Sequence, residues 1–251
     1  MKLSGRTILV TGGSAGIGLA FAEKFLQLGN EVIITGRRAS KLDEAKARHP
    51  ELHTIVSDAG NAASVAALAT EVIARFPKLD VLMNNAGVFV TRNLSRPDPD
   101  LAALTTELDI NLAGTIRTTS ALIGVLKANR GTIINMSSGL AFVPLPCAPI
   151  YCATKAALHS YTVSLRLQLR EAGVEVVELM PPAVRTEGLA DVPPDIKVIT
   201  TDALVAATIP LLLAGVLEIR PGQANALHWM SRIAPGFINA QLFKSSRSMI
   251  P

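Results

Sequence analysis

Short runs of β-branched and aliphatic residues alternate with longer helical segments along most of this chain, and this alternation narrows the possible folds more than any other feature. The strand-like runs are Thr7–Val10, Val32–Thr35, His53–Val56, Val81–Met83, Thr132–Met136 and Val174–Leu179. The helix-like segments between them lie near residues 15–28, 40–48, 61–75, 100–128 and 151–172. Alternating strands and helices form βαβ units, whose right-handed crossovers build a parallel sheet covered on both faces. The sequence therefore predicts an α/β fold with a Rossmann-like, doubly wound sheet, and we expect residues 1–251 to form a single domain.

Composition and charge exclude several classes of protein. With 49% hydrophobic and 18% charged residues, the chain does not have the composition of a disordered segment. Its net charge of +4 arises from 24 basic against 20 acidic residues without a block of like charges, so no nucleic-acid partner is expected. The tightest basic cluster is Arg37, Arg38 and Lys41, which suits a phosphate group better than a duplex.

Location and metal binding are also constrained. The N-terminal segment lacks the apolar region and cleavage site of a signal peptide. The most apolar stretch, 203–217, is too short to span a bilayer comfortably, so no membrane partner is expected. Two cysteines, Cys147 and Cys152, give little scope for disulfides, and the four histidines form no ligand-like cluster. We therefore expect a cytoplasmic, reduced protein without a metal.

The pattern changes after residue 179. Four prolines frame a segment without clear periodicity, namely Pro181, Pro182, Pro193 and Pro194. An apolar helix is predicted near 202–217, and beyond Pro221 the pattern is irregular. Ligands of open α/β sheets bind beyond the carboxyl ends of the strands, so residues 181–220 are expected to supply a substrate loop and lid helix. The apolar residues of the tail, such as Trp229, would pack on the core or at a subunit interface.

A glycine-rich turn, Thr11-Gly12-Gly13-Ser14-Ala15-Gly16-Ile17-Gly18, follows the first strand-like run. Glycines at positions 12, 16 and 18 permit a tight backbone and the close approach of a pyrophosphate to a helix N-terminus. Between an initial strand and an amphipathic helix, this turn indicates a dinucleotide site, with a plain tight turn as the alternative.

Tyr151 and Lys155 lie four residues apart in a predicted helix. Residues at this spacing share one helix face, about 5–6 Å apart at Cβ. An ammonium favours the ionised form of a neighbouring phenol, so the pair predicts a tyrosine with a lowered pKa that exchanges protons near neutral pH. The pair alone arises often by chance on solvated helix faces.

Together, these motifs resemble the short-chain dehydrogenase/reductase family over about residues 3–187. The turn beginning at Thr11 matches its Thr-Gly-x-x-x-Gly-x-Gly loop, and Asn84–Gly87 matches its Asn-Asn-Ala-Gly motif. Asn111 falls in a long predicted helix, and Ser138 precedes Tyr151 by thirteen positions. The stretches that begin at Ser138 and Tyr151 are further similar to the bacterial DltE-like branch.

The resemblance implies an oxidoreductase that transfers a hydride between a nicotinamide dinucleotide and a carbonyl or secondary alcohol. It implies Tyr151 as general acid for reduction and general base for oxidation, with Ser138 polarising the substrate oxygen. It implies that Lys155 lowers the tyrosine pKa and binds the ribose, and that Asn111 holds a water of a proton relay. Two alternatives remain: Ser137 in place of Ser138, and a purely structural Asn111 that satisfies backbone groups inside its helix. Packing or hydrogen bonding is the default for His159 and Tyr161, while Asp109 and Glu178 are unassigned.

The resemblance also implies a set of cofactor contacts. They are Gly12, Ser14, Gly16, Ile17, Gly18, Arg37, Asp58, Asn85, Gly87, Tyr151, Lys155, Val184 and Thr186. After the second strand the chain has Gly36, Arg37 and Arg38 and no carboxylate for ribose hydroxyls, which favours NADP(H) over NAD(H). Arg37 is the expected phosphate ligand, and Asp58 contacts adenine or forms an Asx cap. Pro182 stands where the family has glycine, which removes a backbone N–H beside the nicotinamide.

The expected substrate is a small carbonyl or alcohol compound, neutral and hydrophobic, because the candidate walls are apolar. These walls are Val88, Phe89, Leu140, Phe142, Val143 and Leu189, which could equally belong to the core. An alternative function is an NADP(H)-sensing protein without turnover. A sugar-nucleotide epimerase would need a larger C-terminal domain than the roughly 65 residues after Thr186. The resemblance further implies a homodimer or homotetramer.

Overall fold

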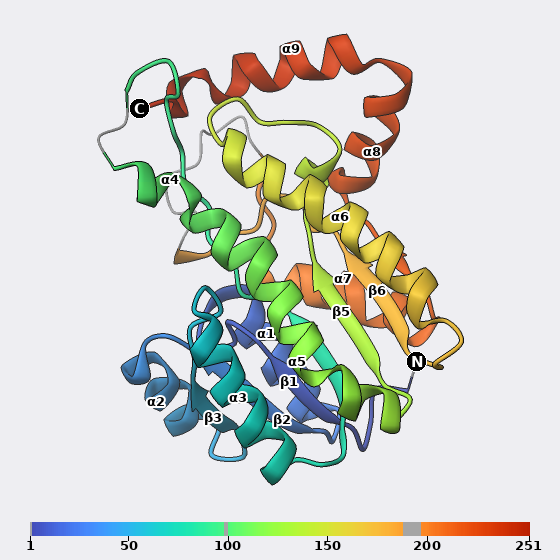
Figure 1. The fold of residues 1–251 in the computed structure, drawn as a ribbon. Coiled ribbons are helices and arrows are strands. Elements are labelled where there is room, and N and C mark those ends of the chain that lie inside the picture. Colours follow the sequence, from blue (N-terminus) through green and yellow to red (C-terminus); the bar gives the residue numbers. More distant parts are fainter. Residues whose placement is uncertain (1, 98–99, 188–196) are drawn as a thin grey trace.

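The computed structural model describes residues 2–97, 100–187 and 197–251 (Figure 1). Within these ranges, seven parallel strands form one sheet in the order β3-β2-β1-β4-β5-β6-β7. The strands are β1 (Thr7–Val10), β2 (Glu31–Gly36), β3 (His53–Val56), β4 (Leu79–Asn84), β5 (Thr132–Met136), β6 (Glu175–Leu179) and β7 (Glu218–Ile219). The strand order reverses between β1 and β4, the point at which open α/β sheets bind ligands. The predicted doubly wound sheet is confirmed.

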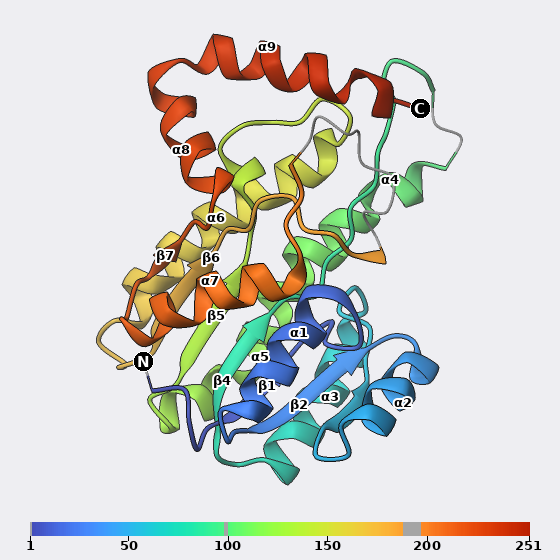
Figure 2. The ribbon, with the colours of Figure 1, turned by 180° about the vertical axis from the view of Figure 1, so that it is seen from behind.

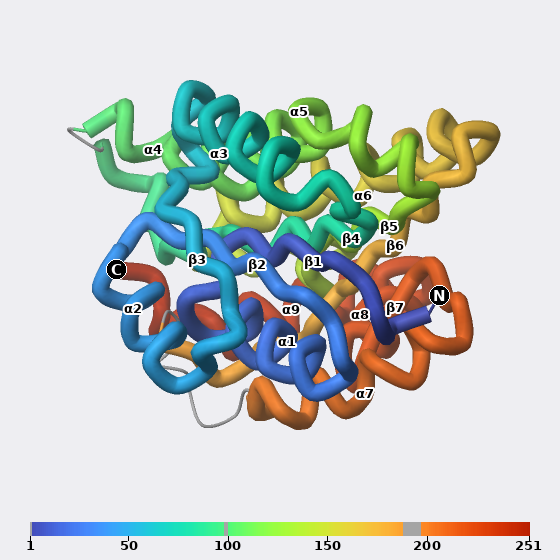
Figure 3. Tube along the Cα trace, turned by 90° about the horizontal axis from the view of Figure 1, so that it is seen from below, coloured from blue at the N-terminus to red at the C-terminus, as the bar shows by residue number. Residues whose placement is uncertain are grey.

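Helices cover both faces of the sheet (Figures 2 and 3). They are α1 (Gly16–Gln27), α2 (Ala39–Arg48), α3 (Ala62–Arg75), α4 (Leu101–Glu107), α5 (Gly114–Ala128), α6 (Pro149–Leu169), α7 (Thr201–Leu213), α8 (Gln223–Ile233) and α9 (Pro235–Ser246). Figure 3 shows α3, α5 and α6 on one side of the sheet and α1, α2 and α7 on the other. The strands β1, β2, β4, β5 and β6 therefore supply apolar side chains to both layers. Ile8 and Val10 of β1 pack in the core beside α1, whereas Leu9 packs in the core beside α3 and α5.

One long predicted helix is interrupted. The segment predicted at 100–128 consists of α4 and α5 joined by a turn of π-helix over Leu108–Ala113. A π-helical turn accommodates an extra residue and often marks a functional site. This turn contains Asn111, whose side chain is fully buried.

The apolar helix after residue 200 belongs to the core. Thr200 caps α7 by accepting a hydrogen bond from the N–H of Ala203. Its apolar face packs with α1 against the sheet through Leu204, Val205, Ile209 and Leu212. A lid role for the segment 181–220 stays a prediction, and residues 188–196 of that segment lie outside the described residues.

The C-terminal region differs from the prediction. Beyond Pro221 we expected an irregular tail, but the structure forms α8 and α9 there, and β7 just before them. These helices lie at one end of the sheet, beyond β5 and β6 and beside the start of α6 (Figure 1). The sequence gives a weak periodic signal because few of their residues are buried, and Trp229 and Phe237 are 56% and 64% exposed. In the part of the chain that is described, no helix combines the length and hydropathy needed to cross a bilayer.

Candidate active site

A cleft of about 340 Å³ opens at the carboxyl ends of β1, β2 and β4. It is lined by Gly12, Ser14, Ala15, Gly16, Ile17, Thr35, Gly36, Arg37, Arg38, Ser57, Asp58, Ala59, Asn85, Ala86, Gly87, Val88, Ile110, Thr186 and Glu187. The strand order places Arg37 and Asp58, after β2 and β3, at one end of the cleft and Gly87, after β4, at the other. The cleft therefore lies at the reversal of the strand order.

Gly12 and Gly36 line the cleft, Gly18 does not, and none of the three has room for a side chain. A Cβ on Gly12, whose φ is +64°, would lie 2.8 Å from the Cα of Ala86. A Cβ on Gly18 would lie 2.5 Å from the carbonyl oxygen of Gly12, and one on Gly36 would lie 2.6 Å from Oγ of Ser14. Backbone therefore forms this part of the cleft.

The N-terminus of α1 has amides available to a ligand. The helix has Ala15 at its N-cap, with no side-chain cap and no acidic residue in its first turn. The first N–H groups of a helix lack intrahelical acceptors and, with the helix dipole, favour a phosphate. A cleft with glycine walls and an uncapped helix start fits the pyrophosphate of a dinucleotide.

Asn85 ties the loop after β4 to the loop after β1. Its Nδ2 donates hydrogen bonds to the carbonyl oxygens of Thr11, at 2.9 Å, and Gly12, at 3.1 Å. In return, Oγ1 of Thr11 accepts from the backbone N–H groups of Asn85 and Ala86, at 3.0 and 3.1 Å. The hydrogen bonds of this side chain hold together the two loops that form the floor of the cleft.

The two arginines after β2 have different surroundings. Arg38 pairs with Glu187, at 3.4 Å, and Glu187 also lies 3.8 Å from Nζ of Lys41. Arg37 makes no ion pair or hydrogen bond to any of the described residues, although it lines the cleft. Its guanidinium is thus available to an anion.

Asp58 lines the cleft but does not cap the following helix. It lines the cleft, and its Oδ1 accepts a hydrogen bond from the N–H of Gly60 at 2.9 Å. The N-cap of α3, however, is Asn61, whose Oδ1 accepts from the N–H of Ser64. An Asx turn therefore holds Asp58 at the edge of the cleft without making it the helix cap.

Lys155 is buried beneath the opposite end of the cleft. Its Nζ donates a hydrogen bond to the carbonyl oxygen of Met136 at 2.8 Å and lies 5.5 Å from the ring centroid of Tyr151. A Cβ on Gly87, which lines the cleft, would lie 3.7 Å from this Nζ. Burial lowers the pKa of Lys155 to about 8, and the charge of Glu178 opposes that shift.

The pKa of Tyr151 departs from its expected direction. Burial raises it to about 12, and the carboxylate of Glu107 adds to the increase, while a hydrogen bond with Ser138 opposes it. The expected lowering by Lys155 is therefore wrong for this structure. The ammonium lies over the ring face and bonds to a backbone carbonyl, and the phenol loses the water that would stabilise its anion.

Ser138, and not Ser137, faces the tyrosine. The side chain of Ser138 lies near enough to the phenol to lower the pKa of Tyr151, and it accepts from the N–H of Leu140 at 3.1 Å. Ser137 points elsewhere and donates to Oε1 of Glu178 at 2.5 Å. Adjacent residues of an extended segment face opposite ways, so only one of the two reaches the phenol.

Asn111 joins three segments around the site. Its Oδ1 accepts from the N–H of Val88 at 2.8 Å, and its Nδ2 donates to the carbonyl oxygen of Val88 at 2.9 Å and to Oγ1 of Thr154 at 3.2 Å. These partners lie outside its own helix, on the loop after β4 and on α6. Its backbone carbonyl also accepts from the hydroxyl of Thr115.

The remaining expected residues fall into two groups. Ser14, Gly16, Ile17 and Thr186 line the cleft. Val184 instead is buried in the core, where it forms a parallel bridge with Ile199. Pro182 needs no backbone donor here, because the bridge is made by Arg185 N–H to Ile199 and by Ile199 N–H to Ala183.

The predicted substrate walls are partly wrong. Phe142 turns away from the tyrosine and packs between His159 and His228, at ring-centroid distances of 5.1 and 4.5 Å. Val143 belongs to the buried interior, and Leu189 lies outside the described residues.

An apolar wall is nevertheless present beside Tyr151. Phe89 packs edge-on against its ring at 5.0 Å. The other members of this cluster are Leu140, Leu145, Cys147, Ala148, Cys152, Leu242, Met249 and Ile250. The C-terminal part of the chain thus contributes to the wall, which the sequence did not indicate.

Two buried carboxylates near the site carry no sequence signal. Glu107 of α4 accepts from the N–H of Val90 through Oε1, while Oε2 has no hydrogen-bond partner among the described residues. Burial raises its pKa. Glu178 of β6 is fully buried and hydrogen-bonded to Ser137 and His159. Within the described ranges, no three or more His, Cys, Asp or Glu side chains form a group that could hold a metal.

Comparison with known proteins finds one matching family and several similar oxidoreductases. Residues 6–197 match the family model described as short chain dehydrogenase. The uncharacterized oxidoreductase DltE of Bacillus subtilis (strain 168) is 42% identical over 187 residues, which is 74% of each chain.

Solved structures agree. A short chain dehydrogenase from Burkholderia cenocepacia J2315 in complex with NADP is 28% identical with a TM-score of 0.85, covering 96% of this chain and 99% of that one. The 3-ketoacyl-(acyl-carrier-protein) reductase from Brucella melitensis complexed with NADH is 27% identical with a TM-score of 0.79, covering 89% and 100%.

Proposed function

Because the chain belongs to the short-chain dehydrogenase family, we propose that it transfers a hydride between NADP(H) and a carbonyl or secondary alcohol substrate, with Tyr151 as general acid and base. One observation carries this proposal. Ser138 lies near enough to Tyr151 to lower its pKa beside an apolar wall, and Lys155 lies between this tyrosine and Gly87 of the glycine-lined cleft.

Tyr151 and Ser138 would act on the substrate oxygen. With a pKa of about 12, the phenol holds its proton at neutral pH and is therefore ready to protonate the oxygen of a carbonyl during reduction. Ser138 would donate a hydrogen bond to the same oxygen and stabilise its developing negative charge. The nicotinamide would supply the hydride at the neighbouring carbon.

Lys155 and Asn111 would supply the proton route. When the cofactor is bound, Lys155 would bind the ribose hydroxyls, and its charge would then favour ionisation of Tyr151. The side chain of Asn111 is already occupied by Val88 and Thr154. Its backbone carbonyl accepts the Thr115 hydroxyl and has a second lone pair, so this carbonyl is the group we assign to the relay water. The remaining cofactor contacts would be those residues of the expected set that line the cleft.

Arg37 supports NADP(H) over NAD(H). Among the described residues it is the arginine of the cleft without an ion pair, whereas Arg38 is already paired with Glu187. An unpaired guanidinium can form charge-assisted hydrogen bonds with a 2′-phosphate. Relatives have been solved with either NADP or NADH, so the preference rests on this residue.

The apolar cluster around Tyr151 supports a neutral, hydrophobic substrate. Phe89 and Leu140 flank the tyrosine, and Leu242 and Met249 extend the wall from the C-terminal helices. We further propose that residues 1–251 act as a single catalytic domain, with a substrate loop within 181–220, in a cytoplasmic homodimer or homotetramer.

A screen of NADPH and NADH oxidation against aldehydes and ketones tests the proposal. Tyr151→Phe should retain cofactor binding and lose turnover by about two decades or more, the scale of a positioned acid. The chain has one other tyrosine, Tyr161, ten positions further along α6, and Tyr161→Phe is the matched control that should keep near-normal rates. Equal rates for wild type and Tyr151→Phe would contradict the mechanism. Tight NADPH binding without turnover on any compound would favour a nucleotide sensor instead.

A further inference from the structure

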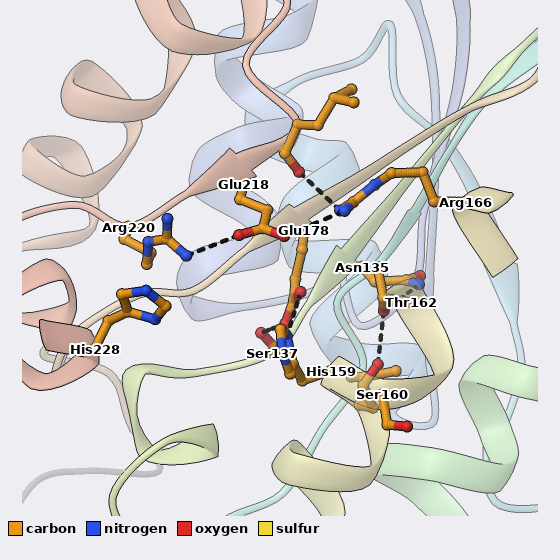
Figure 4. Close-up of polar contacts among 12 residues, drawn as sticks. Asn135, Ser137, His159, Ser160, Thr162, Arg166, Glu178, Glu218, Arg220 and His228 are labelled. Carbon is orange, nitrogen blue, oxygen red and sulfur yellow. Dashed lines mark hydrogen bonds and ion pairs between the residues drawn. The ribbon is translucent and has the colours of Figure 1, made fainter. Parts of the chain in front are cut away.

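A buried polar cluster lies between α6 and the strands β5 and β6 (Figure 4). At its centre is Glu178 of β6, whose side chain is fully buried. Oε1 of Glu178 accepts from the hydroxyl of Ser137 at 2.5 Å, and Oε2 lies 2.8 Å from Nδ1 of His159. Both carboxylate oxygens are therefore held in place from opposite sides.

The cluster and Lys155 share the same short stretches of chain. His159 follows Lys155 by one turn of α6, and Ser137 follows Met136, whose carbonyl oxygen accepts the hydrogen bond from Nζ of Lys155. Lys155 is only 4% exposed. A buried ammonium is costly unless an opposite charge compensates it. Glu178 supplies a charge of the required sign, and its field raises the pKa of Lys155 against the lowering caused by burial.

The neighbouring carboxylate on the sheet edge is already neutralised. Glu218 of β7 is the register partner of Glu178. Its carboxylate pairs with Arg166 at 3.2 Å and Arg220 at 2.8 Å. Glu178 has instead His159 as its ion-pair partner, which is charged only when protonated. Two carboxylates on adjacent strands thus have different roles.

The other titratable groups around this cluster are separate from it. On the side of α8, His228 is divided from His159 by the ring of Phe142. The pKa of His228 is lowered by burial and by nearby arginines, so it contributes little charge at neutral pH. On the side of the substrate wall, the acidic groups are Tyr151 and Glu107.

We propose that Glu178, held by Ser137 and His159, is the counter-ion that keeps Lys155 protonated and in position. Glu178 is thus a positioning residue for the proposed reaction, and the inference rests on that proposed function. It requires no new ligand. It assigns to Lys155 an acidic neighbour on β6.

Direct titration of Lys155 tests the link without cofactor or substrate. Carbon-13 labelling of lysine Cε and NMR titration of the apoprotein would follow the ammonium, with Lys155→Arg assigning the signal. In Glu178→Gln, which keeps the side-chain shape, we expect the midpoint to move to lower pH by about one unit, the scale of a nearby opposite charge. Glu218→Gln, on the adjacent strand, should leave it unchanged.

Folding of the variants must be checked by circular dichroism. If Glu178→Gln does not fold, Glu178→Met, of similar volume and without charge, should give the same displacement of the midpoint. Glu178→Asp, which retains the charge, should recover most of the wild-type value. An unchanged midpoint in a folded, uncharged variant would overturn the inference.

The consequence for turnover is measured separately. If protonated Lys155 is needed, the basic limb of the kcat/KM profile in Glu178→Gln should move with the NMR midpoint. A displacement by one unit from a pKa of about 8 corresponds to a loss of about fivefold at pH 8 and almost none at pH 6.5. If the midpoint moves but wild type shows no turnover, the proposed function fails and the electrostatic link stands. If wild type turns over and the midpoint stays, the link alone fails.

Discussion

The side-chain amide of Asn85 fills the space in which a Cβ on Gly18 would lie, because that Cβ would be 2.4 Å from its Nδ2. The same Nδ2 donates hydrogen bonds to the carbonyl oxygens of Thr11 and Gly12. The loop after β4 therefore determines the shape of the loop after β1, and Gly18 makes this contact possible.

Gly18→Ala should destabilise the protein and weaken nucleotide binding. Its Cβ would clash with Asn85 and with the backbone oxygen of Gly12, and overpacking of this kind costs about 1–3 kcal/mol. The free energy of unfolding from urea denaturation and the Kd for NADPH would measure both effects. Gly124→Ala, in the middle of α5 with open space around the Cβ, is the control and should be neutral or slightly stabilising. Equal stability of the two variants would contradict the prediction.

Replacement of Arg37 should change the cofactor preference. Arg37→Ala removes the unpaired guanidinium, so we expect the Kd for NADPH to rise about tenfold or more while the Kd for NADH stays nearly constant. Arg38→Ala should have a smaller effect, because that side chain already pairs with Glu187. Calorimetric titration of both dinucleotides into both variants provides the measurement. A larger effect at Arg38 would reassign the phosphate ligand.

Asn111→Ala should reduce both stability and turnover. The substitution leaves the N–H and carbonyl of Val88 without their partner, and a buried unsatisfied group costs about 1–3 kcal/mol. Asn129→Ala is the matched control at the far end of α5, where the side chain donates to the carbonyls of Pro77 and Leu79. It should reduce stability but not kcat measured on the folded protein. Loss of kcat in both variants would indicate a general effect of unfolding.

Because of Lys155, the free energy of unfolding should depend on pH in the alkaline range. The unfolded chain keeps this proton up to the ordinary lysine pKa of 10.5, whereas the folded chain releases it near pH 8. Between these values the unfolded state binds more protons, so the free energy of unfolding rises with pH. From pH 7.5 to 9.5 the contribution is about 2 kcal/mol. The buried thiols Cys147 and Cys152, whose raised pKa values act in the opposite direction, are present in both wild type and Lys155→Met, so the difference between the two urea-denaturation curves should change by this amount. Parallel curves for the two proteins would contradict the prediction.

The βα units could be predicted from the sequence because each of them repeats the same physical pattern. The runs from Thr7–Val10 to Val174–Leu179 coincide closely with β1 to β6, since buried parallel strands are continuous apolar runs. β7 has two residues, too few for a pattern. In α8 and α9 most positions are exposed, so the apolar spacing of α8, at Ala224, Leu227, Met230 and Ile233, does not mark a buried core face.

Only those parts of the candidate site that lie in short, contiguous motifs could be predicted from the sequence. Glycine spacing and the pair of Tyr151 and Lys155 are visible in short windows. Glu178 and His159 are nineteen positions apart, on a strand and a helix, and only the sheet brings them together. The raised pKa of Tyr151 also depends on burial, which the spacing of two residues does not reveal.

Trp229, the single tryptophan of the chain, lies on α8 with its indole 5.7 Å from the ring of His228. Helix α8 rests on the short turn that begins with Gly139, immediately after Ser138. The tryptophan fluorescence of this protein therefore originates from one helix, which packs against the turn that follows Ser138. A change in tryptophan emission when a compound is added would therefore report binding near α8, on the side of the proposed substrate site.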